Sequence, residues 1–232
     1  MVKAQEWLEE NYPIDGVCQR KNEISNINNF GKKRNEITEL FVKRENLTGS
    51  FQLTGFSKLT KLIIVNNDFD DLTIFSSLVN LEVLMIMNNP WTDSFQPLQT
   101  LSRLSSLNVW NTNLTTGLEY LPESLKKFWC SGKLAEELEV YGQPHGTLDH
   151  NYISLLQAWK KAHPDLMMRA QEIKELTSIL INLNLALTNQ TLAELTDKFF
   201  QIFIFETEDK IKELKKQNQA YYENKIEIPP KN

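Results

Sequence analysis

Three histidines and a nearby aspartate form one candidate group of side chains for holding a metal ion. His145, His150 and His163 lie within one stretch that also contains Asp149. Zinc sites use pairs of ligands at short, fixed spacings, and these spacings do not match any such pattern. The sequence therefore predicts solvated histidines, with no metal and no other cofactor.

A second candidate for metal chemistry is the acidic stretch NNDFDD, which contains Asp68, Asp70 and Asp71. A calcium loop needs oxygen ligands in a regular order along about twelve residues, and that order is missing here. Asparagine and aspartate are also typical of turns, because their side chains accept hydrogen bonds from nearby backbone N–H groups. We expect a turn at this point.

Two cysteines, Cys18 and Cys130, are the candidates for nucleophilic or redox chemistry. Cys130 takes an apolar place in the repeated pattern described below, so it is expected to be packed and unreactive. Cys18 lies in a polar segment, where a solvent-exposed thiol is compatible with the pattern. The chain has no G-x-S-x-G, H-E-x-x-H or glycine-rich phosphate loop, and we predict that it is not an enzyme.

The stretch LEVLMIMNN, residues 81–89, is a candidate for binding through apolar contacts, because it is apolar on both faces of an expected strand. A half-buried strand alternates apolar and polar residues. Here Leu84 and Ile86 are apolar, and so are Met85 and Met87 on the opposite side. Either both faces are buried, or one of them is a contact surface.

This stretch is one copy of an internal repeat. The same order of apolar and polar positions occurs in residues 37–47, 59–69, 81–91 and 104–114, whose starts are 22, 22 and 23 residues apart. A fifth, degenerate copy begins 21 residues later, at Leu125. One repeat cannot bury its own apolar side, so repeats at a constant period must stack on one another.

The pattern and its period resemble those of the leucine-rich-repeat family, over about residues 37–135. The resemblance implies an α/β fold, a short solenoid with one strand per repeat in a parallel sheet on the concave face. It also implies a ladder of buried asparagines that satisfy backbone groups between repeats. Asn67 and Asn89 occupy that position, whereas the other three repeats have Glu45, Thr112 and Lys133.

The segments on either side of the repeats are predicted to be helical caps and a tail. Residues 1–36 are expected to form an N-terminal cap with one helix, residues 37–140 the repeats, and residues 141–232 an all-α tail. In the tail we expect a short helix over 151–163 and then a hairpin of two helices. The first helix of this hairpin has a coiled-coil seam at Ile173, Leu176, Leu180, Leu183 and Leu187.

The second helix of the hairpin is expected to open at a capping box formed by Thr191 and Glu194. Its segment FFQIFIF, residues 199–205, is apolar nearly all round and predicts burial on several sides.

The strand residues that point away from the core define a predicted contact surface. We expect it to contain Phe41, Ile63, Val65, Met85, Met87, Trp110 and Trp129, with lysine and arginine at its margin. Large exposed apolar surfaces mark interaction sites, and tryptophan and methionine favour them. The predicted function is therefore non-catalytic binding of a protein or peptide on the concave face.

Three alternatives remain open from the sequence. In the first, the chain's own C-terminal helices cover this surface. In the second, another copy of the chain covers it. In the third, the chain is a self-assembling scaffold that oligomerises through the C-terminal helices. Some leucine-rich-repeat proteins are ubiquitin ligases that use a cysteine in a helical domain. Residues 136–232 contain no cysteine, which argues against that activity.

Composition narrows the remaining classes of function. The formal net charge is −5, and residues 37–159 carry all of the excess, with 8 basic and 13 acidic residues, so nucleic-acid binding is not predicted. The first residues lack the apolar core of a signal peptide, and no stretch reaches the roughly 18 apolar residues of a membrane helix. From these features we expect a cytoplasmic protein that does not bind membranes.

Overall fold

The computed structural model describes residues 2–20, 24–50, 52–92, 94–144, 151–188 and 197–225. The chain forms two compact units, Met1–Ala162 and His163–Asn232. The first unit contains the repeats and the second contains a helical hairpin.

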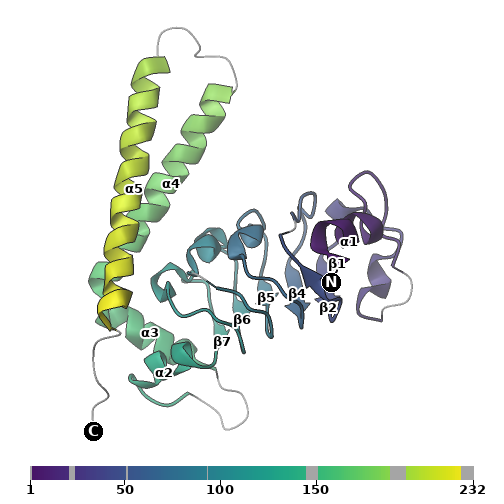
Figure 1. Cartoon of the computed structure of the whole chain (residues 1–232), viewed down its shortest axis with the longest axis horizontal. Coiled ribbons are helices and arrows are strands. Elements are labelled where there is room, and N and C mark those ends of the chain that lie inside the picture. Colours follow the sequence, from purple (N-terminus) through teal and green to yellow (C-terminus); the bar gives the residue numbers. More distant parts are fainter. Residues whose placement is uncertain are drawn as a thin grey trace. The chain divides into compact units, whose positions relative to one another are not determined.

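A five-stranded parallel sheet organises the first unit (Figure 1). Its strands follow one another in chain order: β2 (Glu39–Lys43), β4 (Lys61–Val65), β5 (Val83–Met85), β6 (Ser106–Asn108) and β7 (Lys127–Trp129). Each comes from one of the five repeats, and this confirms the predicted α/β leucine-rich-repeat solenoid. The repeated pattern predicts strands near residues 40–42, 62–64, 84–86, 107–109 and 128–130. The last three strands start and end one residue earlier than these predicted positions.

The strands form because each repeat places a large apolar side chain at the same point of the register. Leu84 pairs with Leu62 on one side and with Leu107 on the other, and all three are fully buried. Two residues after Leu84, Ile86 is also fully buried. Burial of such a side chain stabilises a fold by about 1.5–3 kcal/mol, so these positions hold the stack of repeats together.

The returning arms of the repeats pack aromatic side chains on the other side of the sheet. The rings of Phe69 and Trp91 are stacked with their centroids 5.5 Å apart, and Phe75 contacts the same indole at 5.3 Å. The Trp91 indole N–H donates to the Ile86 carbonyl at 2.8 Å. The arms contain short 3-10 helices, η3 (Leu72–Phe75), η4 (Gln96–Thr100) and η5 (Leu118–Tyr120).

The turn at the acidic stretch is explained by capping. The Asp71 carboxylate accepts from the Thr73 N–H at 2.8 Å at the start of η3. This agrees with the expected turn.

The N-terminal segment packs against the first repeat. Helix α1 (Ala4–Asn11) buries Ala4, Trp7 and Leu8, the face expected from the sequence. Before it, β1 (Val2–Lys3) pairs in parallel with β3 (Leu47–Thr48) from the first arm. Two 3-10 helices follow, η1 (Ile24–Asn29) and η2 (Arg34–Glu36).

Two helices continue the first unit after the last strand. The fifth repeat leaves the pattern after Cys130 and forms α2 (Lys133–Glu139), and α3 (Ile153–Ala162) follows. The Trp159 side chain of α3 is fully buried, and its indole N–H donates to the Glu137 carboxylate at 2.6 Å. The sequence-based boundary at residue 140 therefore falls inside the first unit, between α2 and α3.

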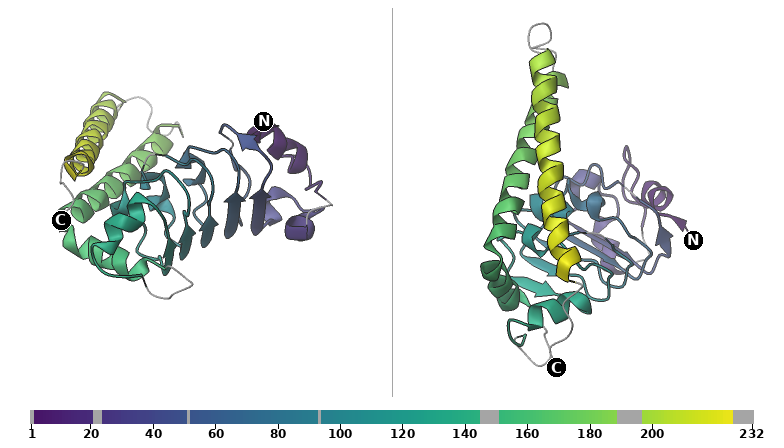
Figure 2. Two further views of the ribbon diagram at one scale, coloured as in Figure 1. Left: turned by 60° about the horizontal axis from the view of Figure 1, so that its bottom comes forward. Right: turned by 60° about the vertical axis from the view of Figure 1, so that its left-hand side comes forward.

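The second unit is a hairpin of α4 (Pro164–Thr188) and α5 (Asp197–Lys225), which run side by side (Figure 2). Ile173 of the seam is fully buried, whereas Leu176, Leu180 and Leu183 are only partly buried. The expectation that the segment 199–205 is buried on several sides is wrong for its described side chains at 203–205, where only Ile204 is buried, because one neighbouring helix covers one face. Phe203 and Phe205 are 49% and 61% exposed. The predicted capping box lies outside the described residues.

Candidate functional site

The register of the sheet aligns the outward-facing side chains of all five strands in one row. Phe41 pairs with Ile63, Ile63 with Met85, Met85 with Asn108, and Asn108 with Trp129. Ile63 is buried by its neighbours, and the other four are partly exposed. We call this the first row. The structure thus brings together four of the seven predicted contact residues in a continuous line.

A second row runs beside it, at the last residue of β4 and just past the carboxyl ends of β5 and β6. It contains Val65, Met87 and Trp110, which backbone hydrogen bonds place in step. The Asn66 N–H donates to the Met87 carbonyl at 3.3 Å, and the Asn88 N–H donates to the Trp110 carbonyl at 3.1 Å. Trp110 is the most exposed of these side chains, at 44%. Together, the two rows are called the concave face below, and their binding role stays a prediction.

The asparagine ladder beneath the second row fixes its backbone. The Asn67 carbonyl oxygen accepts from the N–H groups of Glu45 and Leu47, at 3.1 and 3.3 Å. Its amide donates to the carbonyls of Val42 and Val65, at 3.0 and 3.2 Å. These bonds join the first two repeats, as the resemblance implied for this position.

A second set of asparagines lies at the surface, and the sequence reasoning missed it. Asn66, Asn88 and Asn111 have positive φ values of 55°, 54° and 54°, a conformation that asparagine tolerates better than most residues. The Asn88 amide donates to the Asn66 side chain at 2.9 Å, and the Asn111 amide donates to Asn88 at 3.0 Å. The signal was present in the sequence, because an asparagine precedes the ladder position in three successive repeats.

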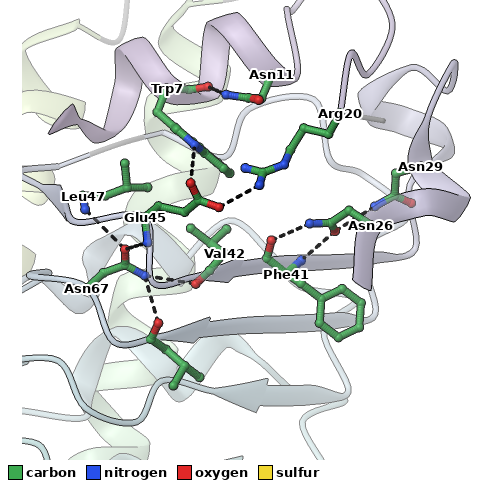
Figure 3. A network of polar contacts seen from close by, with 11 residues as sticks. Trp7, Asn11, Arg20, Asn26, Asn29, Phe41, Val42, Glu45, Leu47 and Asn67 are labelled. Carbon is green, nitrogen blue, oxygen red and sulfur yellow. Dashed lines mark hydrogen bonds and ion pairs between the residues drawn. The ribbon is translucent and has the colours of Figure 1, made fainter. Parts of the chain in front are cut away.

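The first edge of the sheet is closed by side chains from the N-terminal cap (Figure 3). Asn26 accepts from the Phe41 N–H at 3.1 Å and donates to the Phe41 carbonyl at 2.7 Å, as a neighbouring strand would. Asn29 donates to the Glu39 carbonyl at 2.7 Å. An open strand edge is a template for pairing with another chain, and these bonds occupy that template on β2.

The last edge is closed in a similar way. The Phe128 N–H of β7 donates to the Asn151 side chain at 3.0 Å, and the Phe128 carbonyl accepts from the Tyr152 N–H at 2.7 Å. Asn151 and Tyr152 directly precede α3. Strand addition at either edge would have to break these bonds, so the concave face is the more accessible surface for a partner.

Glu45 replaces the ladder asparagine in the first repeat and connects that repeat to the cap (Figure 3). Its carboxylate accepts from Arg20 at 2.7 Å and from the Trp7 indole at 3.3 Å. Arg20 also lies over the Trp7 ring, 5.0 Å from its centroid. The departure from the family pattern at Glu45 is therefore explained by the partners that only the cap supplies.

Basic side chains border the concave face near its first strand. The Lys43 and Lys61 ammonium groups lie 4.9 and 5.3 Å from the centroid of the Phe41 ring. Lys61 also pairs with the Glu39 carboxylate at 3.3 Å. Beside Phe41 lies a hollow of about 380 Å³ that Asn28, Asn29, Lys32, Thr38 and Glu39 line.

The cysteines do not form a reactive site. Cys130 is fully buried, as expected, but Cys18 is buried too, so exposure of its thiol is ruled out. Burial raises the pKa of both thiols and thereby lowers the population of the reactive thiolate. Cys18 is buried because the polar segment folds back over it. The backbone N–H of Cys18 donates to the Lys32 carbonyl, and the Cys18 carbonyl accepts from the Gly31 N–H.

Other chemistry receives no support within the part of the chain that the structure describes. Histidine, cysteine, aspartate and glutamate do not gather there in groups of three or more that could hold a metal ion. His145 and His150 lie outside the described residues. None of the described helices is long and apolar enough to span a bilayer.

Comparisons with known proteins give a structural likeness only. Neither a protein-family model nor a curated protein matches the chain. Among solved structures, internalin C2 of Listeria monocytogenes is 28% identical over 38% of this chain, with a TM-score of 0.33. Another internalin of that species, inlF, is 22% identical over 48% of this chain, with the same TM-score. The matches span 41% and 34% of those two proteins, less than half of their lengths.

Proposed function

We propose that the chain is a non-catalytic binding module whose concave face holds a protein or peptide partner. The observation that carries the proposal is the first row. It has one residue on each of the five strands, and four of the five are large and apolar: Phe41, Ile63, Met85 and Trp129. The fifth is an asparagine, Asn108, which lies between Met85 and Trp129. Phe41, Met85 and Trp129 in this row are partly exposed, and contiguous exposed apolar surface is typical of interaction sites.

The chemistry of the row fits recognition of another protein. Aromatic and methionine side chains are enriched in the cores of protein interfaces, and tryptophan is prominent among the residues that dominate binding energy. Methionine adapts its shape to different partners. Closed strand edges favour side-chain contacts on the face over pairing along an edge.

Affinity purification with full-length variants tests this proposal. Trp110→Ala together with Trp129→Ala should remove the partners that the wild-type chain captures, because each side chain is an expected anchor. The matched control is Val79→Ala with Val140→Ala, which truncates two exposed apolar residues outside the two rows. Thermal unfolding of both variants should match that of the wild type and exclude a general loss of structure.

The proposal fails if every captured partner is retained by the tryptophan variant. It also fails if the control variant loses the same partners, since the effect would then come from the loss of apolar surface anywhere on the chain.

Self-assembly through the helical hairpin is a second candidate function, and the exposed residues of its two helices favour it. Phe203 and Phe205 of α5 are large and exposed, and so are Ile179 and Ile181 of α4, at 42% and 52%. From Leu176 to Thr188 the chain carries no charged residue. A second hairpin would cover the faces that one antiparallel partner leaves open.

Light scattering after size-exclusion chromatography tests this candidate. The full chain should form dimers or larger assemblies, and Phe203→Ser with Phe205→Ser should return it to a monomer. A wild-type chain that is monomeric at high micromolar concentration would refute self-assembly.

A further inference from the structure

The charges of the first unit are distributed unevenly over its surfaces. Residues 37–159 contain 13 acidic and only 8 basic residues. Five of these basic residues nevertheless border the concave face: Lys43, Arg44, Lys61, Lys126 and Lys127. Of the described acidic residues in this range, Glu39 and Glu82 lie beside the rows, and Glu39 is paired with Lys61. A unit with excess negative charge thus presents a basic margin on this face.

The basic residues gather at the two ends of the first row. At one end, Lys43 and Lys61 lie against the Phe41 ring, and Arg44 is exposed next to them. At the other end, Lys126 and Lys127 are both exposed, and Lys127 lies two residues before Trp129 in the same strand.

Between these ends the strands carry few charges. Ile63 and Met85 occupy the middle of the first row, and Val83 and Ser106 pair with each other just before it. Glu82, the residue before β5, is the single described charge in this middle part. The face therefore has an apolar middle and a basic group at each end.

We propose that the partner is a protein segment with apolar side chains in its middle and acidic residues on both sides of them. This inference rests on the proposed function of the concave face and adds the chemistry of the partner. Complementary charges at the two ends of a segment fix its position and speed its association, while the apolar middle supplies most of the affinity.

The size of the face sets the length of the segment. Phe41 and Trp129 are separated by four strand-to-strand steps of about 4.8 Å, or roughly 19 Å in total. An extended chain rises about 3.3 Å per residue, so about six residues cover this distance. The acidic residues of the partner should accordingly lie about six to eight residues apart.

Selection from a phage-displayed library of random 12-residue peptides, on the immobilised full chain at low ionic strength, tests the inference. The selected peptides should be enriched in aspartate and glutamate on both sides of an apolar stretch. Their dissociation constants, measured by fluorescence anisotropy, should rise at least about tenfold in Lys43→Glu with Lys127→Glu, and also on raising the salt concentration to about 0.5 M.

The matched control is Arg103→Glu with Lys161→Glu, which makes the same change in net charge at two exposed positions outside the strands. This control should weaken peptide binding by less than about threefold. A similar loss in both variants would show that net charge alone governs binding, and would overturn the inference.

Further outcomes distinguish a failure of this inference about the partner's chemistry from a failure of the proposed binding function. Peptides that need Trp129 but show no acidic enrichment would overturn the inference and leave the proposed function standing. Peptides that bind regardless of Trp110→Ala with Trp129→Ala would contradict both, and so would a library from which no peptide is selected. Heparin that competes as well as the peptides do would point to a polyanion ligand and overturn the role of the apolar middle.

Discussion

The side-chain carbonyl of Asn89 accepts a hydrogen bond from the backbone N–H of Asn67, one repeat earlier, at 3.1 Å. The Asn89 amide donates to the carbonyls of Ile64, Ile86 and Met87, at 3.0, 3.2 and 2.9 Å. One buried side chain thus satisfies backbone groups of two neighbouring repeats directly beneath Met85 and Met87. The shape of the middle of the concave face depends on this contact.

Replacing Asn89 by alanine should therefore destabilise the first unit strongly. The side chain is buried, and its loss leaves several backbone groups without a partner, each at a cost of about 1–3 kcal/mol before relaxation. We expect a loss of about 3 kcal/mol in the free energy of unfolding, measured by urea denaturation. The exposed Asn113→Ala should change it by less than about 0.5 kcal/mol. Equal effects of the two substitutions would contradict the role of the ladder.

The closure of the first sheet edge gives a second prediction. Asn26→Ala removes both hydrogen bonds that join the cap to Phe41, so it should lower stability by about 2 kcal/mol in urea denaturation. It should also raise the tendency of the chain to associate, because the edge of β2 becomes available for pairing. Light scattering over time checks this second effect, with the exposed Asn28→Ala as the control. An Asn26→Ala chain that is as stable as this control would refute edge closure.

Most of the repeat region could be predicted from the sequence, because stacking forces every repeat to place its apolar residues at the same positions. The period located all five strands to within one residue, and the inward positions of Leu84, Ile86 and Cys130 followed from it. The buried ladder at Asn67 and Asn89 was also visible, since asparagine recurs at the family's position. Even α1 was indicated by the spacing of its apolar residues.

What could not be predicted depends on contacts between distant parts of the chain. The polar segment before the repeats gave no sign that Asn26 and Asn29 replace a missing strand, or that Cys18 is buried beneath it. The apolar composition of residues 199–205 indicated burial, but composition does not state how many neighbours a helix has. Exposure of Phe203 and Phe205 follows from the hairpin, which supplies one neighbour only.

Burial of the two cysteines predicts low thiol reactivity. Because burial raises the pKa of both thiols, the thiolate is scarce at pH 8, and the reagent cannot reach the sulfur atoms directly. Reaction with Ellman's reagent should be at least about a hundredfold slower in the native chain than in guanidinium chloride. In the denaturant two thiols per chain should react. Fast reaction of one thiol in native buffer would show that Cys18 is accessible.

The ion pair between Glu9 and Arg34 predicts a contribution to stability that depends on pH. Their charged atoms are 2.8 Å apart, and the hydrogen bond from Arg34 lowers the pKa of the Glu9 carboxyl. A lowered pKa in the folded state means that the stabilisation is complete above the unfolded-state value, near 4.5, and is lost as the pH falls through the folded-state value.

Glu9→Gln should therefore reduce stability at pH 7, and its difference from the wild type should shrink as the pH falls below the unfolded-state value near 4.5 and through the lowered folded-state pKa. Urea denaturation at several pH values measures this difference. The exposed neighbour Glu10→Gln serves as the control and should stay close to the wild type throughout. A Glu9→Gln deficit that does not change with pH would contradict the assignment.

Photo-crosslinking from the concave face tests the central claim most directly. A benzoylphenylalanine residue at Met85, in the middle of the first row, should crosslink the full chain to a partner segment that is apolar with acidic flanks. The same group at Val79, which is exposed outside the two rows, should not. Crosslinks from position 79 alone, or crosslinks from position 85 only to the chain's own residues, would contradict the proposal that this face binds a partner.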